Sequence, residues 1–327
     1  MSDFEIPPQP HPMPLTTGKI LDHIWVLLKA NWKLYVALGS VPMGAMMLME
    51  AGVFGVLFAA GAFPLKAGTT PMPPEMVRRM VWIIGPLVLL LDLVFLAVYA
   101  LFQSAACYAT LEANRGRATT FSRAWGQAWG RLGRYAWLGF VKALCLGAPM
   151  VLCFLIIGII SAVFAVSKHG GLGQDGVFVL ISIFLVAFLA TPVYGIWMAL
   201  KLALAFPACV HEDIPGWESM KRSNFLTQHA KGRIFLVMLV VYALTYAAMF
   251  ALEMVGFLLL SVGSLVAMAL HLQWNSFLAI AGIMIGGLAV LAAFVALFGL
   301  SMSSVAVALS VIYDDQRARL EPQGEPA

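Results

Sequence analysis

Five charged residues lie inside apolar stretches that are otherwise suited to a lipid bilayer. Glu50 and Glu253 are expected near the outer interface, and the other three are Asp92, Lys142 and Lys201. A carboxylate deep in a bilayer costs about 2.5–3.5 kcal/mol even on the mildest insertion scale, so Asp92 needs a partner or water. Such a residue can relay an ion or proton, contact a substrate, or lock helix packing as a protonated or paired group. The two lysines are candidate partners, although both could instead extend towards the headgroups. We treat the three residues as a candidate intramembrane polar site.

A second group of polar residues lies in the segment that joins two apolar stretches, at positions 206–235. This segment leaves one apolar stretch, crosses a short acidic turn and continues through a basic amphipathic stretch into the next. Glu212, Arg222 and Ser223 are suited to cap the amphipathic helix and to attach the turn to the rest of the bundle. Together with Arg233 they form a predicted structural elbow.

The sequence lacks common catalytic motifs. GxSxG, HExxH and GxxxxGK[ST] do not occur, and the glycines at 170–173 are interpreted as a loop. Cys209, His211, Glu212 and Asp213 include metal-ligand types, but no second ligand cluster accompanies them. The cysteines form no CxxC pair, which favours buried thiols over a disulfide framework. We therefore predict no catalytic residues, no metal, no cofactor and no enzymatic activity.

Composition indicates the elements that must position these residues. The residue types AVILMFWYC make up 61% of the 327 positions and DEKR only 11%, whereas soluble proteins are about half apolar and about a quarter charged. The apolar runs are long enough to span a bilayer and are continuous rather than alternating, which favours helices over a barrel. The sequence thus predicts an all-α polytopic membrane bundle. Its six predicted spans cover about 34–60, 81–108, 135–166, 177–207, 234–260 and 277–311.

The predicted spans are separated by loops and by amphipathic stretches. Residues 61–80 are rich in proline and are expected to form a loop. The end of the fifth span is not defined, since residues 261–270 remain apolar, and a re-entrant segment near 254–270 would reverse the C-terminus. Small residues recur every three or four positions in the sixth span and predict a packing face, within the bundle or between protomers. They are Gly282, Gly286, Ala289, Ala293, Ala296, Gly299 and Ser303.

Amphipathic stretches at about 16–33, 119–134 and 214–233 precede the first, third and fifth spans. Their basic residues are interleaved with aromatic ones, which favours anionic lipid headgroups as partners over nucleic acid. The order of amphipathic stretch, span, outer loop and span therefore occurs three times. The predicted membrane domain, 16–319, would consist of the units 16–117, 118–213 and 214–319.

The basic residues also predict the orientation of the chain. Most lysines and arginines fall on the side of the two termini, and the positive-inside rule then places both termini in the cytoplasm. Residues 1–15 are proline-rich and 320–327 are polar, so both are predicted to be flexible tails, and no cleavable signal peptide is expected. We predict a multi-pass protein of a bacterial inner (plasma) membrane.

The segment around the elbow resembles a known family. The residues are Pro207-Ala208-Cys209-Val210-x-Glu212, Ser219-x-x-Arg222-Ser223-x-x-Leu226-Thr227 and Gly232-Arg233-Ile234-Phe235, followed after the last span by Tyr313-Asp314-Asp315-Gln316-Arg317. This pattern is similar to bacterial six-span proteins of the glycerophosphodiester phosphodiesterase membrane-domain type. The chain departs from it at Gln228-His229, where a Lys-Gly pair is usual. The resemblance implies only the membrane part, because no His-Arg-Gly opening occurs and no room exists for a barrel of roughly 250 residues.

Two functions are consistent with this sequence. The first is a non-enzymatic membrane protein that acts as a scaffold, accessory or regulatory partner, with a protein partner or a second copy. The alternative is a transporter, channel or lipid-handling protein that uses Asp92 in the bundle. A membrane-embedded hydrolase is disfavoured because no catalytic set is found.

Overall fold

The computed structural model describes residues 15–59, 74–166, 174–228, 230–269 and 277–320, and within these ranges it contains helices and no strands. The predicted tails at 1–15 and 320–327 fall outside the described residues except for Leu15 and Leu320. The glycine-rich segment at 170–173 and the part of the predicted loop at 61–73 also lie outside them.

Six helical segments of the described chain are long and apolar enough to cross a membrane, which confirms the predicted all-α, six-span class. Most of their large apolar side chains are exposed on the protein surface, as expected for helices that face lipid. The segments are Trp32–Phe58, Gly85–Asn114, Leu132–Ile160, Phe178–His211, Lys231–Gly263 and Met284–Leu320.

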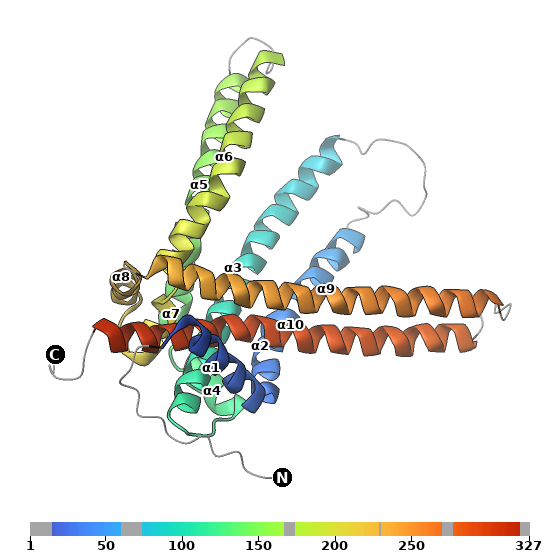
Figure 1. The fold of residues 1–327 in the computed structure, drawn as a ribbon. Coiled ribbons are helices and arrows are strands. Elements are labelled where there is room, and N and C mark those ends of the chain that lie inside the picture. Colours follow the sequence, from blue (N-terminus) through green and yellow to red (C-terminus); the bar gives the residue numbers. More distant parts are fainter. Residues whose placement is uncertain (1–14, 60–73, 167–173, 229, 270–276, 321–327) are drawn as a thin grey trace.

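One short helix followed by two long ones is the order found three times along the chain. The members of each long pair contact one another, and the three pairs diverge from a common region, here called the base, where the short helices gather (Figure 1). The helices are α1 (Thr17–Ala30), α2 (Trp32–Ala59) and α3 (Pro74–Asn114); α4 (Phe121–Trp129), α5 (Leu132–Val166), α6 (Gln174–Lys201) and a further short α7 (Ala205–His211); then α8 (Gly216–Thr227), α9 (Lys231–Ala269) and α10 (Phe277–Leu320).

Local sequence explains several helix ends. Thr16 and Thr120 are the N-caps of α1 and α4, and each side-chain oxygen accepts a hydrogen bond from the backbone N–H three residues later. The prediction of a loop through residue 80 was wrong, since α3 already begins at Pro74. Proline is favoured at the first position of a helix, where its missing N–H has no intrahelical partner to lose. The α9 helix continues without a break through residues 254–269.

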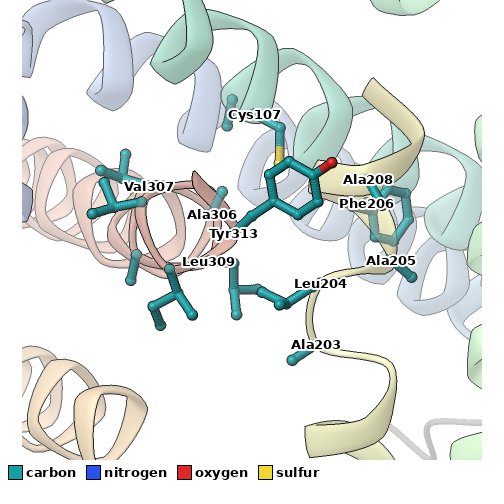
Figure 2. Close-up of a cluster of buried hydrophobic side chains, with 14 of the residues drawn as sticks. Cys107, Ala203, Leu204, Ala205, Phe206, Ala208, Ala306, Val307, Leu309 and Tyr313 are labelled. Atoms are coloured by element: carbon teal, nitrogen blue, oxygen red, sulfur yellow. The ribbon is translucent and has the colours of Figure 1, made fainter. Parts of the chain in front are cut away.

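The base contains the buried core of the protein. Tyr35, Tyr135 and Tyr313, one from each long pair, are among its largest fully or almost fully buried side chains. Figure 2 shows Tyr313 of α10 among buried side chains of α3 and of the segment around α7. The hydroxyl of Tyr35 lies 3.2 Å from that of Thr110, which joins α2 to α3. The three pairs are therefore held together mainly at one end.

A close crossing of α2 and α10 brings two glycine backbones into direct contact. A Cβ atom added at Gly39 would lie 2.0 Å from the carbonyl oxygen of Gly299. Beside this point, Ser303 Oγ donates a 2.7 Å hydrogen bond to the carbonyl of Tyr35. The predicted small-residue face is thus used within the bundle at Gly299 and Ser303, whereas Gly286 has open space around it.

Candidate functional site

A cavity of about 390 Å³ lies where the three helix pairs meet, between α3, α5, α6, α7, α9 and α10. Its walls are mostly aliphatic and aromatic. The polar side chains that line it come from Tyr99 and Gln103 of α3, Lys142 of α5 and Tyr242 of α9. Apolar walls with a few convergent polar groups are typical of ligand sites, and the volume falls within the usual range of about 300–1,000 Å³.

Lys142 is the charged residue of this lining. It lies ten residues into α5, which corresponds to about 15 Å along the helix axis. Its ammonium group lies 5.3 Å from the centre of the Phe206 ring, and within the described residues it forms no ion pair. A cation in apolar surroundings is costly without a counter-charge, and an aromatic face compensates only part of that cost. The cavity is therefore chemically suited to an anion.

Tyr99 and Gln103 form a second polar feature of the cavity. Gln103 is 5% exposed, and its Nε2 donates a 2.8 Å hydrogen bond to the hydroxyl oxygen of Tyr99 one turn earlier on α3. The Tyr99 ring also contacts Phe95 and Phe102, at centroid distances of 6.4 Å and 6.0 Å. These neighbours hold the phenol in place at the cavity wall.

The structure does not bring the three predicted intramembrane residues together. Asp92 is exposed on α3, does not line the cavity, and makes no ion pair with Lys142 or Lys201. Lys201 ends α6, and its ammonium group lies 3.9 Å from the centre of the Trp197 ring. Only Lys142 of the three faces the cavity. The sequence could not separate these cases, because the distance between residues on different helices depends on how those helices pack.

A break in the fourth span lies against the cavity. The span Phe178–His211 is interrupted between Lys201 and Ala205, where α6 ends and α7 begins. Ser223 of α8 donates a 2.8 Å hydrogen bond to the carbonyl of Lys201 and accepts a 3.1 Å bond from the N–H of Leu204. It thereby satisfies backbone groups that the break would leave unpaired. The adjacent Leu200 and Ala203 are part of the cavity lining.

Substitution Ser223→Ala is expected to destabilise the protein by about 1–3 kcal/mol, because it removes the acceptor of the Leu204 N–H and leaves the Lys201 carbonyl with only the longer, 3.5 Å bond from the Thr227 hydroxyl, among the described residues. The measurement is thermal unfolding of the purified protein in detergent. Ser182→Ala is the matched control, since the Ser182 hydroxyl is exposed and, within the described part of the chain, bonds to the carbonyl of Phe178 in its own helix. Equal melting of both variants would contradict this role of Ser223.

Three consecutive residues at the end of α7, His211, Glu212 and Asp213, contact several parts of the base. Glu212 is the one of them that belongs to the predicted elbow. His211 Nδ1 lies 3.1 Å from a carboxylate oxygen of Asp314. Glu212 accepts a 3.0 Å hydrogen bond from Arg222 Nε and a further bond from the Tyr313 hydroxyl. Asp213 follows, at a positive φ of 57°. It pairs with Arg131 and Arg134 at the start of α5.

Arg233 is held by a second cluster in the base. Its Nη1 lies 2.9 Å from Asp315 Oδ2, and it also donates to the carbonyl of Leu15. Arg319 lies 3.0 Å from the same Asp315 oxygen, and the N–H of Leu15 donates a 2.7 Å bond to Asp315 Oδ1. Asp315 was not among the predicted site residues. Its only signal was its position in the Tyr313–Arg317 segment that carries the family resemblance.

The expected capping of α8 was wrong. The N-cap of α8 is Pro215, whose side chain makes no capping hydrogen bond. Glu212 is used instead by Arg222 and Tyr313, and Ser223 by the break between α6 and α7. Glu212, Arg222, Ser223 and Arg233 all contact other parts of the base through these bonds.

Within the described residues, no group of three or more His, Cys, Asp or Glu side chains is placed to hold a metal ion. Comparisons of the chain with protein-family models, with curated proteins and with solved structures find no match. The resemblance to the glycerophosphodiester phosphodiesterase membrane-domain type therefore stays a prediction. The fold defines a class, a six-span helical membrane protein, and the cavity around Lys142 is its candidate ligand site.

Proposed function

We propose that this protein is a non-enzymatic, lipid-handling membrane protein that binds an amphipathic anion in the cavity around Lys142. The observation that carries the proposal is an ammonium group without an ion-pair partner, among the described residues, in a largely apolar cavity. This function corresponds to the lipid-handling alternative drawn from the sequence, with Lys142 in the role first considered for Asp92.

The cavity matches the two parts of an amphipathic ligand. An acidic headgroup would supply the counter-charge that Lys142 lacks, and ion pairing is strong where water is scarce. The surrounding aliphatic walls, which include Leu146, Ile196 and Met238, would contact an acyl chain. Binding would therefore gain both from charge neutralisation and from burial of apolar surface.

We further propose that the base faces the cytoplasm of a bacterium and that the protein lies in its inner membrane. The distribution of lysine and arginine supports this orientation. Trp25 on α1, Trp129 on α4 and Trp217 on α8 are all exposed, at 67%, 58% and 59%. Tryptophan is favoured at the boundary between lipid and water, so these helices are suited to lie among anionic headgroups.

A scaffold or accessory role is the second candidate. The observation that favours it is the outer half of the small-residue face on α10, where Gly286, Ala289 and Ala293 are exposed in the monomer. Such a face lets another helix approach closely, from a partner protein or from a second copy of this chain. The two roles are compatible, because this face lies outside the residues that line the cavity.

Substitution Lys142→Met tests the proposal, since it keeps the length of the side chain and removes its charge. The purified protein in detergent is expected to bind radiolabelled oleate, and the variant about tenfold to hundredfold more weakly, as for loss of a charge-assisted bond. Lys201→Met is the matched control, because Lys201 also lies in a span but outside the cavity. No oleate binding by the wild type, or equal binding by Lys142→Met, would reject the proposed site.

A further inference from the structure

We infer that Tyr99, positioned by Gln103, is a specificity-determining residue that selects a monoanionic carboxylate headgroup, as in a fatty acid. This inference rests on the proposed function, because it assigns the ligand of the same cavity. The inference is based on the hydrogen bond between Gln103 and Tyr99 and on Lys142, the single cationic side chain that lines the cavity.

The direction of the hydrogen bond determines what Tyr99 can offer. The amide of Gln103 donates to the phenol oxygen of Tyr99, so the proton of that hydroxyl remains for another acceptor. Among the described residues, Gln103 is the one hydrogen-bond partner of this hydroxyl. Tyr99 lines the cavity as a donor, and an acceptor oxygen of a ligand would complete its bonding.

The two groups together match a carboxylate. One carboxylate oxygen can pair with the Lys142 ammonium while the other accepts from the Tyr99 hydroxyl, and both line the same cavity. A single negative charge is balanced by the single lysine. A phosphate monoester carries about −1.5 to −2 charges at neutral pH, so part of its charge would remain without compensation in apolar surroundings. A neutral alcohol would leave Lys142 without a counter-charge.

The order of ligand preference tests this assignment. Oleate, oleyl phosphate and oleyl alcohol share one chain, and each competes against radiolabelled oleate on the full-length protein. We expect oleate to bind about tenfold or more tightly than either competitor. Oleyl phosphate that binds as tightly as oleate would overturn the carboxylate assignment while leaving the anion site intact.

Two substitutions test the role of Tyr99. Tyr99→Phe removes only the hydroxyl oxygen and is expected to weaken oleate binding about tenfold. Tyr242→Phe removes the same atom from another tyrosine of the lining and is expected to change oleate affinity less than about twofold, because Gln103 does not orient that hydroxyl. Oleate affinity unchanged in Tyr99→Phe would overturn the inference.

A double-mutant cycle of Tyr99 and Gln103 tests whether Gln103 affects oleate affinity by positioning the Tyr99 hydroxyl or only by stabilising the fold. Gln103→Met is expected to weaken oleate binding several-fold in the wild-type background and to have little effect on a Tyr99→Phe background. The double variant also removes both partners of the hydrogen bond, so neither is left unpaired. Equal effects of Gln103→Met in both backgrounds would show that Gln103 does not act through Tyr99.

The binding measurements distinguish a failure of the proposed function from a failure of the carboxylate assignment. If wild type binds oleate and Lys142→Met does not, the proposed function stands whatever Tyr99→Phe does. If wild type fails to bind oleate, both the proposed function and this inference are rejected.

Discussion

Substitution Gly39→Ala is expected to destabilise the protein by about 3 kcal/mol or more. The new methyl group would lie 2.0 Å from the carbonyl oxygen of Gly299, and a backbone atom cannot rotate away as a side chain can. The α2 and α10 helices would have to separate, which also stretches the bond between Ser303 and the carbonyl of Tyr35. Overpacking of a well-packed core typically costs about 1–3 kcal/mol, and a backbone clash lies at the upper end. Thermal unfolding in detergent measures the loss.

Gly44→Ala is the matched control for this crossing. Gly44 lies in the same helix, and an added Cβ atom there would meet nothing within 4 Å. Alanine has a higher helix propensity than glycine, as measured in water. Gly44→Ala is therefore expected to leave the melting temperature unchanged or to raise it slightly. Gly286→Ala on α10 serves the same purpose for the partner helix. If Gly39→Ala melted like Gly44→Ala, the close crossing of α2 and α10 would be disproved.

Substitution Asp315→Ala is expected to have the second large effect on stability. The Asp315 side chain is 0% exposed and lies 2.9 Å from Arg233 and 3.0 Å from Arg319. Its removal leaves two guanidinium groups without their carboxylate and the N–H of Leu15 without its acceptor. Breaking a buried ion pair costs about 3–5 kcal/mol, and we expect the lower end because both arginines are partly exposed. The measurement is the midpoint of thermal unfolding.

Two variants make the test of Asp315 specific. Asp315→Asn keeps an oxygen that can accept from Leu15 and should lose less stability than Asp315→Ala. Asp22→Ala removes an exposed carboxylate from α1 and is expected to change the melting midpoint little. A loss in Asp315→Ala no greater than in Asp22→Ala would show that the cluster does not join the N-terminal segment, α9 and α10.

The helix crossing at Gly39 and the polar contacts of the base join the three units of the chain. The crossing at Gly39 and Gly299 joins the first pair to the third, and the elbow joins α7 to α8 and α10. Both lie towards the base, whereas the remaining parts of the long pairs diverge (Figure 1). The cavity around Lys142 lies between the pairs, so a ligand held there would contact helices of all three units.

Several features of the protein follow from the sequence by itself. Continuous apolar runs require helices in lipid, because backbone groups there can be satisfied only within the segment. Thr16 and Thr120 mark the starts of α1 and α4 through local capping bonds. The six spans and the positions of the amphipathic helices were predictable on these grounds, since both depend on residues near one another in the chain.

Only the tertiary structure decided which polar residues meet. Asp92, Lys142 and Lys201 are alike in sequence as charges within spans, yet only Lys142 faces the cavity, because the rotation and crossing of each helix determine which side is covered. The same holds for Ser223, whose hydroxyl is matched to a break in a different helix. Local pattern determines where helices form in this protein, whereas contacts between distant helices determine the site.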